Sequence, residues 1–160
     1  MRFADFKTGM VIESGPRRVE AEEIIRFASQ YDPQWFHVDP ERAARGRWKG
    51  LIASGWLTCG IMMELAVQCV LQGSECFGSP GVDALQWLAP VRPGDALRLR
   101  IEVLESRRSS SGGTGIVRWR WELWNQDGTQ VLSQLGTSLF EIEPAAAMSS
   151  TPRRRDAGCP

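Results

Sequence analysis

The only histidine of the chain, His37, lies five residues after Asp32 in the segment YDPQWFHVDP. A carboxylate and an imidazole can hold one water molecule between them and exchange protons with it. Because histidine titrates near neutral pH, either group can be the formal base, and the sequence leaves that choice open. Each residue also has a structural interpretation. The imidazole can be a hydrogen-bonded structural group in an aromatic-rich loop, and Asp32 can cap a turn before Pro33.

Composition narrows the classes of function. The chain has 160 residues, 19 basic and 19 acidic side chains, and a hydrophobic fraction of 42%. This length favours one domain with a real core. The balanced charge gives no broad electrostatic reason to bind nucleic acid or an anionic membrane. The start, MRFADFKTGM, shows no apolar signal region, so a cytoplasmic location is expected.

The cysteines and the single histidine argue against disulfides and metal sites. The four cysteines, Cys59, Cys69, Cys76 and Cys159, form no C-x-x-C pair. We expect buried, reduced thiols, as is usual in a cytoplasmic protein. One histidine leaves few ligands for zinc, so no metal site is expected.

The elements on both sides of the histidine are expected to hold it in place. Residues 10–19 are expected to form a strand, and residues 21–31 have the spacing of an amphipathic helix. The segment 31–40 is expected to be a loop. A short helix over Pro40–Arg45 should follow, with Asp39 as its N-cap.

The most apolar segment of the chain is Leu51–Leu71. It is expected to be one long helix, buried on most of its surface, with one polar stripe that argues against a membrane span. Ser54-Gly55 can be simply the start of this helix, with Ser54 as N-cap. Ser54 is not expected to be a nucleophile, because GLIASG lacks the Gly-x-Ser-x-Gly elbow.

The second half of the chain alternates with period two. Strands are expected near residues 81–89, 95–107, 115–125 and 130–142, joined as an antiparallel meander. The tryptophans at 119, 121 and 124 are expected to pack on the sheet, with a dimer surface as the alternative. A long helix and a sheet that wraps it make an α+β domain.

Three stretches carry a resemblance to a known family: FASQYDPQWFHVDPERA, GLIASGW and WLAPVRPGDALRLRIEVLE. They resemble the MaoC-like hydratases and dehydratases, which include the (R)-specific enoyl-CoA hydratases, over roughly residues 5–142. The resemblance implies a single hot-dog domain over residues 1–143, with an antiparallel β-sheet wrapped around a long central α-helix. The low-complexity residues 144–160 are expected to be a disordered tail.

The resemblance also implies the roles of the candidate residues. Asp32 and His37 match the catalytic pair. Gly55 matches the residue whose backbone amide binds the thioester oxygen, with Ser54 beside it. A backbone N–H at a helix start stabilises a developing negative charge, and glycine lets a substrate approach the backbone closely.

Three residues depart from the family pattern. Gln34 and Trp35 stand where the motif Asp-x-Asn-Pro-x-His has Asn and Pro, and Ser54 stands where a histidine is common. Trp35 and the bulky Trp56 are expected to shape the pocket for the acyl chain.

The activity that the resemblance implies is reversible hydration of a trans-2-enoyl-CoA to an (R)-3-hydroxyacyl-CoA. It requires no metal or redox cofactor, and coenzyme A enters as part of the acyl-CoA substrate. A homodimer or a dimer of dimers is expected, since a five-strand sheet leaves an open edge. Two alternatives remain: a hot-dog acyl-CoA thioesterase and a non-catalytic acyl-CoA-binding protein.

Overall fold

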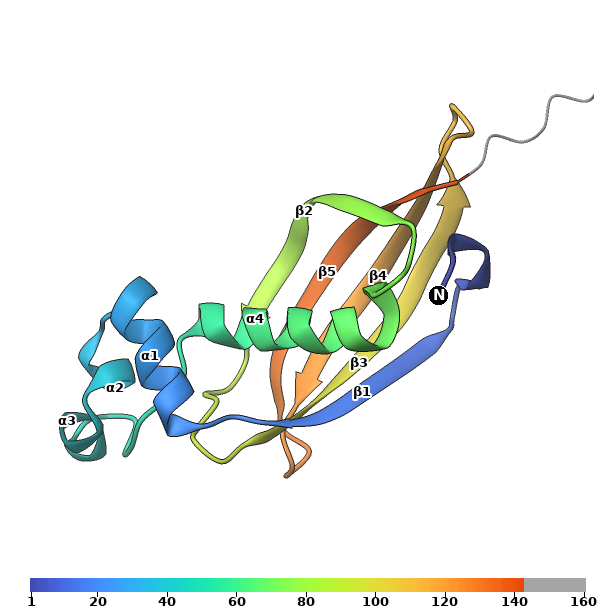
Figure 1. The fold of residues 1–160 in the computed structure, drawn as a ribbon. Helices are drawn as coiled ribbons and strands as arrows, with labels where there is room; N and C mark the ends of the chain where they lie inside the picture. The colour runs from blue at the N-terminus through green and yellow to red at the C-terminus, as the bar shows by residue number, and fades with distance from the viewer. Residues whose placement is uncertain (143–160) are drawn as a thin grey trace, which may run out of the picture.

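In the computed structural model, which describes residues 1–142, one long helix lies across a five-stranded antiparallel sheet (Figure 1). The sheet order is β1-β3-β4-β5-β2, and every neighbouring pair is antiparallel. The strands are β1 (Val11–Arg18), β2 (Cys76–Trp87), β3 (Ala96–Arg108), β4 (Thr114–Trp124) and β5 (Gln130–Glu141). The helices are η1 (Phe3–Asp5), α1 (Ala21–Tyr31), α2 (Trp35–Val38), α3 (Pro40–Arg45), α4 (Gly55–Ala66) and the π-helical turn η2 (Val67–Leu71).

The short helices of the first half of the chain form as the sequence predicts, and one further helical turn, α2, lies between them. Both expected helices, α1 and α3, are confirmed, and the Asp39 carboxylate accepts a hydrogen bond from the Arg42 amide at 3.0 Å. The segment 31–40 is not entirely a loop, because Trp35–Val38 forms one helical turn. Figure 1 shows α1, α2 and α3 gathered at one end of the sheet, beside the start of α4.

The central helix is shorter and more exposed than its apolar sequence predicts. Helix α4 begins at Gly55 rather than Leu51, because the amides of Ile52 and Ala53 bond to carbonyls of other segments, at 3.2 Å and 2.8 Å. Six of the twelve residues of α4 are buried, and four are exposed. The exposed residues include the large apolar side chains of Trp56 and Met63, and Val67 at the start of η2 is exposed as well. No helix within residues 1–142 is long and apolar enough to cross a membrane.

The expected meander is confirmed only for β3, β4 and β5. Strand β2 begins at Cys76, earlier than predicted, and pairs with β5 at the opposite side of the sheet from β1. Residues 88–95 connect β2 to β3, and their Pro90 and Pro93 have no N–H to extend a ladder of hydrogen bonds. In the sheet, β4 and β5 lie between β2 and β3, so this connection is not a hairpin.

The core lies between α4 and the inner face of the sheet. On β4 the side chains of Val117, Trp119, Trp121 and Leu123 are buried, as their alternation predicts. Trp119 also contacts the rings of Phe6 and Phe140. The expected tail, residues 144–160, lies outside the described residues.

Replacing Trp119 by alanine tests this core. The side chain is 1% exposed, and truncation of a buried tryptophan costs about 3–5 kcal/mol of unfolding free energy. We expect Trp119→Ala to lose stability in this range in denaturant unfolding. Arg118→Ala, at the neighbouring exposed position, is the control and should change stability by less than about 0.5 kcal/mol. Equal losses in both variants would contradict this account of the core.

Candidate active site

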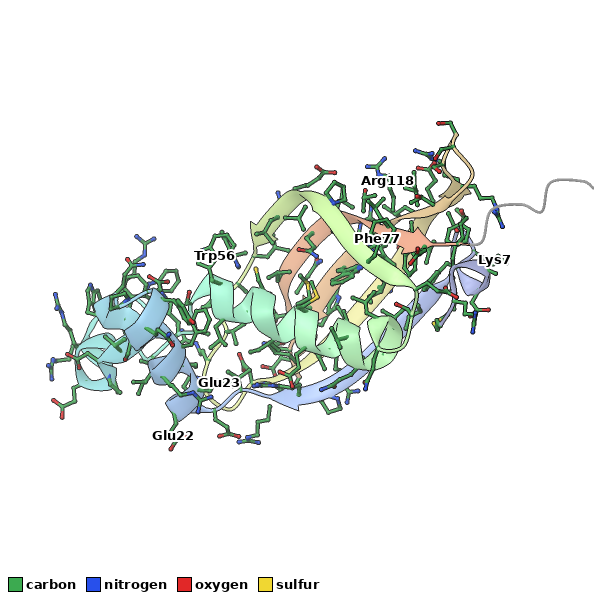
Figure 2. All side chains as sticks on the ribbon, turned by 45° about the horizontal axis from the view of Figure 1, so that its top comes forward. Lys7, Glu22, Glu23, Trp56, Phe77 and Arg118 are labelled. Atoms are coloured by element: carbon green, nitrogen blue, oxygen red, sulfur yellow. The ribbon has the colours of Figure 1, made fainter. Side chains whose placement is uncertain are left out.

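A cavity of about 430 Å³ lies where α1, α2, the start of α4 and the end of β2 meet. Of the residues singled out in the sequence, Asp32, His37, Gly55 and Trp56 line it. The rest of the wall is mainly apolar and aromatic: Trp48, Ile52, Ala53, Trp87, Leu88, Ala89, Pro90 and Val91, with Gln34 and Thr58. Figure 2 shows Trp56 at the start of α4, close to the helices at this end of the molecule.

His37 is fixed by a buried hydrogen bond. The side chain is 5% exposed, and its Nδ1 lies 2.8 Å from the backbone carbonyl oxygen of Ile52. Because a carbonyl oxygen can only accept, Nδ1 carries a proton and donates it. The other ring nitrogen, Nε2, therefore faces the cavity either with a lone pair or, when the ring is charged, with a second proton.

Asp32 is the C-cap of α1, and its carboxylate is held by Gln34, whose Nε2 donates to Asp32 Oδ1 at 2.8 Å. Partial burial raises the pKa of Asp32, but the hydrogen bond from Gln34, the nearby Ser54 side chain and the charge of His37 together lower this pKa by more. The net pKa lies below the ordinary value, so Asp32 is ionised at neutral pH.

The two groups face each other at short range. Asp32 Oδ2 lies 3.3 Å from His37 Nε2. With a neutral imidazole, both atoms are hydrogen-bond acceptors, so their approach is favourable only when a donor lies between or beside them. A water molecule that gives one hydrogen to each atom satisfies both, and a protonated imidazole satisfies the carboxylate directly. The pair is therefore built to hold a proton or a water.

Ser54 and Gly55 form the start of α4 as predicted. Ser54 is fully buried, and its Oγ accepts a hydrogen bond from the Trp56 amide at 3.2 Å. Amides in the first turn of a helix have no partner within the helix, and Gly55 lines the cavity. Trp87 lies against this glycine, and its Nε1 donates to the Gly55 carbonyl at 2.9 Å.

Trp35 does not line this cavity, contrary to the expectation for it. Its ring packs instead under the Arg42 guanidinium, 4.9 Å from the ring centroid, and against Gly46, where a Cβ would lie 2.5 Å from the indole. Trp56 does line the cavity and meets Trp87 edge to face at 5.4 Å between ring centroids.

Sequence reasoning assigned no place in the cavity to most of its lining residues. Gln34 had been noted only as a departure from a motif, yet it supports Asp32. Trp87 and Leu88 reach the cavity from the end of β2, far along the chain from His37, and Trp48 reaches it from the turn after α3. Single large apolar side chains at such positions are a weak local signal, since exposed apolar residues are common on protein surfaces.

The described residues contain no cluster of three His, Cys, Asp or Glu side chains placed to hold a metal ion. Cys59, Cys69 and Cys76 are free thiols of intermediate exposure rather than buried ones, and Cys159 lies outside the described residues. Burial raises the pKa of the Cys59 and Cys69 thiols, so neither is a reactive thiolate at neutral pH.

Replacing Gln34 by alanine tests the support of Asp32. The variant loses a hydrogen bond to the ionised carboxylate, so the pKa of Asp32 should rise toward its ordinary value. Because the folded-state pKa is the lower one, Asp32 stabilises the fold above its unfolded pKa, and this contribution disappears as pH falls through the folded value. The stability loss of Gln34→Ala should therefore be fullest near neutral pH.

A carbon-detected NMR titration of the Asp32 carboxyl measures this pKa directly. Gln30→Ala, at an exposed position on α1, is the matched control and should leave the titration unchanged. An unaltered Asp32 titration in Gln34→Ala would show that this hydrogen bond does not stabilise the carboxylate.

A pair of glycine variants tests the contact of Trp87 with α4. A Cβ on Gly55 would lie 2.6 Å from Trp87 Nε1, whereas one on Gly60 of the same helix would meet no atom within 4 Å. Gly55→Ala should therefore cost about 1–3 kcal/mol of unfolding free energy. Gly60→Ala should be neutral or stabilising by up to about 1 kcal/mol. Equal unfolding midpoints for the two variants would mean that the indole moves aside freely.

Comparisons with known proteins identify the family of the chain. The family model described as "MaoC like domain" matches residues 5–120. The uncharacterized protein YdeM of Bacillus subtilis is 31% identical over 131 residues, which are 82% of this chain and 92% of that protein. The 3-hydroxyacyl-thioester dehydratase Z of Mycobacterium tuberculosis is 35% identical over 82 residues, 50% of this chain and 54% of that enzyme. The crystal structure of the MaoC-like dehydratase from Rhodospirillum rubrum has a TM-score of 0.80 at 35% identity, over 89% of this chain and 97% of that one. The chain therefore belongs to the MaoC-like dehydratase family and has its hot-dog fold.

Proposed function

We propose that this protein catalyses the reversible hydration of a trans-2-enoyl-CoA to a 3-hydroxyacyl-CoA, with (R) stereochemistry. The observation that carries the proposal is the Asp32–His37 pair, 3.3 Å apart, beside the start of α4 in one cavity. The route needs only the chain's own groups, with coenzyme A as part of the substrate.

Acid and base catalysis comes from the pair. A water held by Asp32 and His37 adds its hydroxyl to C3 of the enoyl group as one partner takes the proton. The pair then supplies a proton to C2, so that the elements of one water are added across the double bond. In the reverse direction the same groups remove the proton from C2 and protonate the departing hydroxyl.

The reaction also requires stabilisation of the negative charge that develops on the thioester oxygen. As the hydroxyl adds, negative charge develops on the thioester oxygen, and we assign its stabilisation to the Gly55 N–H and the dipole of α4. The neighbouring Trp56 amide is already bonded to Ser54, so Gly55 is the donor assigned to the substrate.

The substrate class rests on the cavity wall and on the relatives. Aromatic and aliphatic side chains form most of the wall, as an acyl chain requires. The name of the mycobacterial dehydratase gives 3-hydroxyacyl thioesters as its substrates, and we extend that class to this chain.

A homodimer in the cytoplasm completes the proposal. Strand β2 is an edge of the sheet, and exposed apolar side chains lie along it and on α4. They include Phe77 and Val82 on β2, Leu88 directly after it, and Trp56 and Met63 on the helix. A second copy that covers these side chains would also protect the open edge.

The test is loss of enoyl-thioester absorbance with short and medium trans-2-enoyl-CoAs. Asp32→Asn and His37→Ala should each lower kcat/KM by about 10²-fold or more, because each removes one member of the acid–base pair. Chiral analysis of the product checks its configuration. The exposed Gln30→Ala variant serves as the control with unchanged rates.

Two other outcomes would replace the proposal. Release of free coenzyme A thiol without hydration would identify a thioesterase. Tight acyl-CoA binding without turnover, unaffected by His37→Ala, would identify a binding protein.

A further inference from the structure

A basic turn borders the cavity. Residues 41–49 carry four basic side chains and one acidic side chain, although the whole chain has no formal net charge. Arg45 ends α3, and Arg47 and Lys49 flank Trp48 in the turn that follows; all three basic side chains are exposed. Trp48 lines the cavity and is itself 37% exposed, so the turn reaches the edge where the cavity meets solvent. We call Arg45, Arg47 and Lys49 the basic turn.

The backbone of the basic turn is held in place from two sides. The Gly50 amide donates to the Ala43 carbonyl at 3.1 Å, which ties the turn back to α3. Arg92 Nη2 donates to the Trp48 carbonyl at 2.7 Å, which ties it to the segment that follows the cavity wall. The three cations are therefore presented by a fixed backbone rather than by a free loop.

Within residues 1–142, the cations of the basic turn have no acidic partner in an ion pair. By contrast, Arg100 on the sheet pairs with Glu102 at 3.1 Å and with Glu122 at 3.3 Å. A group of cations beside a cavity attracts an anionic part of the ligand that enters it.

We propose that the basic turn binds the phosphate groups of coenzyme A. This inference rests on the proposed function and concerns the carrier end of the same substrate. With the thioester at Asp32, His37 and Gly55, the acyl chain lies inside the cavity and the carrier leaves toward solvent. Phosphate oxygens accept charge-assisted hydrogen bonds from guanidinium and ammonium groups, and arginine can engage two oxygens at once.

A carrier comparison tests the role of the basic turn. The variant Arg45→Gln/Arg47→Gln/Lys49→Gln removes the three charges and keeps polar side chains of similar reach. Its KM for trans-2-butenoyl-CoA should rise roughly tenfold with little change in kcat, because three surface ion pairs are lost. With trans-2-butenoyl-pantetheine, which has no phosphate, kcat/KM should equal that of the wild type. Arg118→Gln, an exposed arginine far from Trp56 in Figure 2, is the control.

A direct measurement of coenzyme A binding distinguishes a failure of this inference from a failure of the proposed function. Calorimetric titration with free coenzyme A should show roughly tenfold weaker binding to the triple variant, and the wild-type affinity should fall with added salt. If no enoyl thioester is hydrated but coenzyme A binding still depends on the basic turn, the proposed function fails and the inference stands.

Three results would overturn the inference. The first is unchanged coenzyme A affinity and KM in the triple variant. The second is an equal loss with the pantetheine substrate, which would mean that the variant damages the reaction site. The third is a loss seen only with a thioester on an acyl carrier protein, which would make the basic turn a protein-docking surface.

Discussion

The hydrogen bond from His37 Nδ1 to the Ile52 carbonyl is the contact on which the site depends. It joins residues 32–37, which carry the carboxylate and the imidazole, to the extended segment that leads into α4. The Ile52 amide donates in return to the Phe36 carbonyl at 3.2 Å, so the two segments are tied in both directions. Because a carbonyl only accepts, the same bond fixes the imidazole tautomer and turns Nε2 toward Asp32. Position and proton placement thus follow from one buried interaction, which solvent cannot easily disrupt.

The wall of the cavity that Trp87 forms depends on β2, an edge strand of the sheet. Trp87 ends β2, and its Nε1 bonds to the Gly55 carbonyl while its ring fills the space beside that glycine. The next amide, that of Leu88, donates to Val131 on the far side of the β4–β5 turn, which sets where the indole lies. Gly55 is therefore required for close packing of the indole, because a Cβ at this position would lie 2.6 Å from the ring. Sheet register and helix start are coupled through this contact.

The parts of the site that follow from local pattern could be predicted, and the parts that depend on distant contacts could not. Helices α1 and α3, the Ser54 cap and the Asp32–His37 spacing all follow from residues near one another in the chain. The pairing of β2 with β5 depends on a connection that carries no pairing signal of its own. Residues 51–53 are apolar like the helix that follows them, but the amides of Ile52 and Ala53 bond to other segments, and only the folded chain shows this. Trp87 was missed for the same reason.

The departures from the family motif show how the pair survives a change of neighbours. Gln34 replaces an asparagine, and its longer side chain still reaches back two residues to donate to Asp32. Trp35 replaces a proline at the first position of α2, and its ring packs outward between Arg42 and Gly46 rather than into the cavity. The hydrogen bond that fixes His37 involves neither residue. Gln34 supports the carboxylate of Asp32, Trp35 stays clear of the cavity, and the shape of the cavity depends instead on Trp56 and Trp87, which line it.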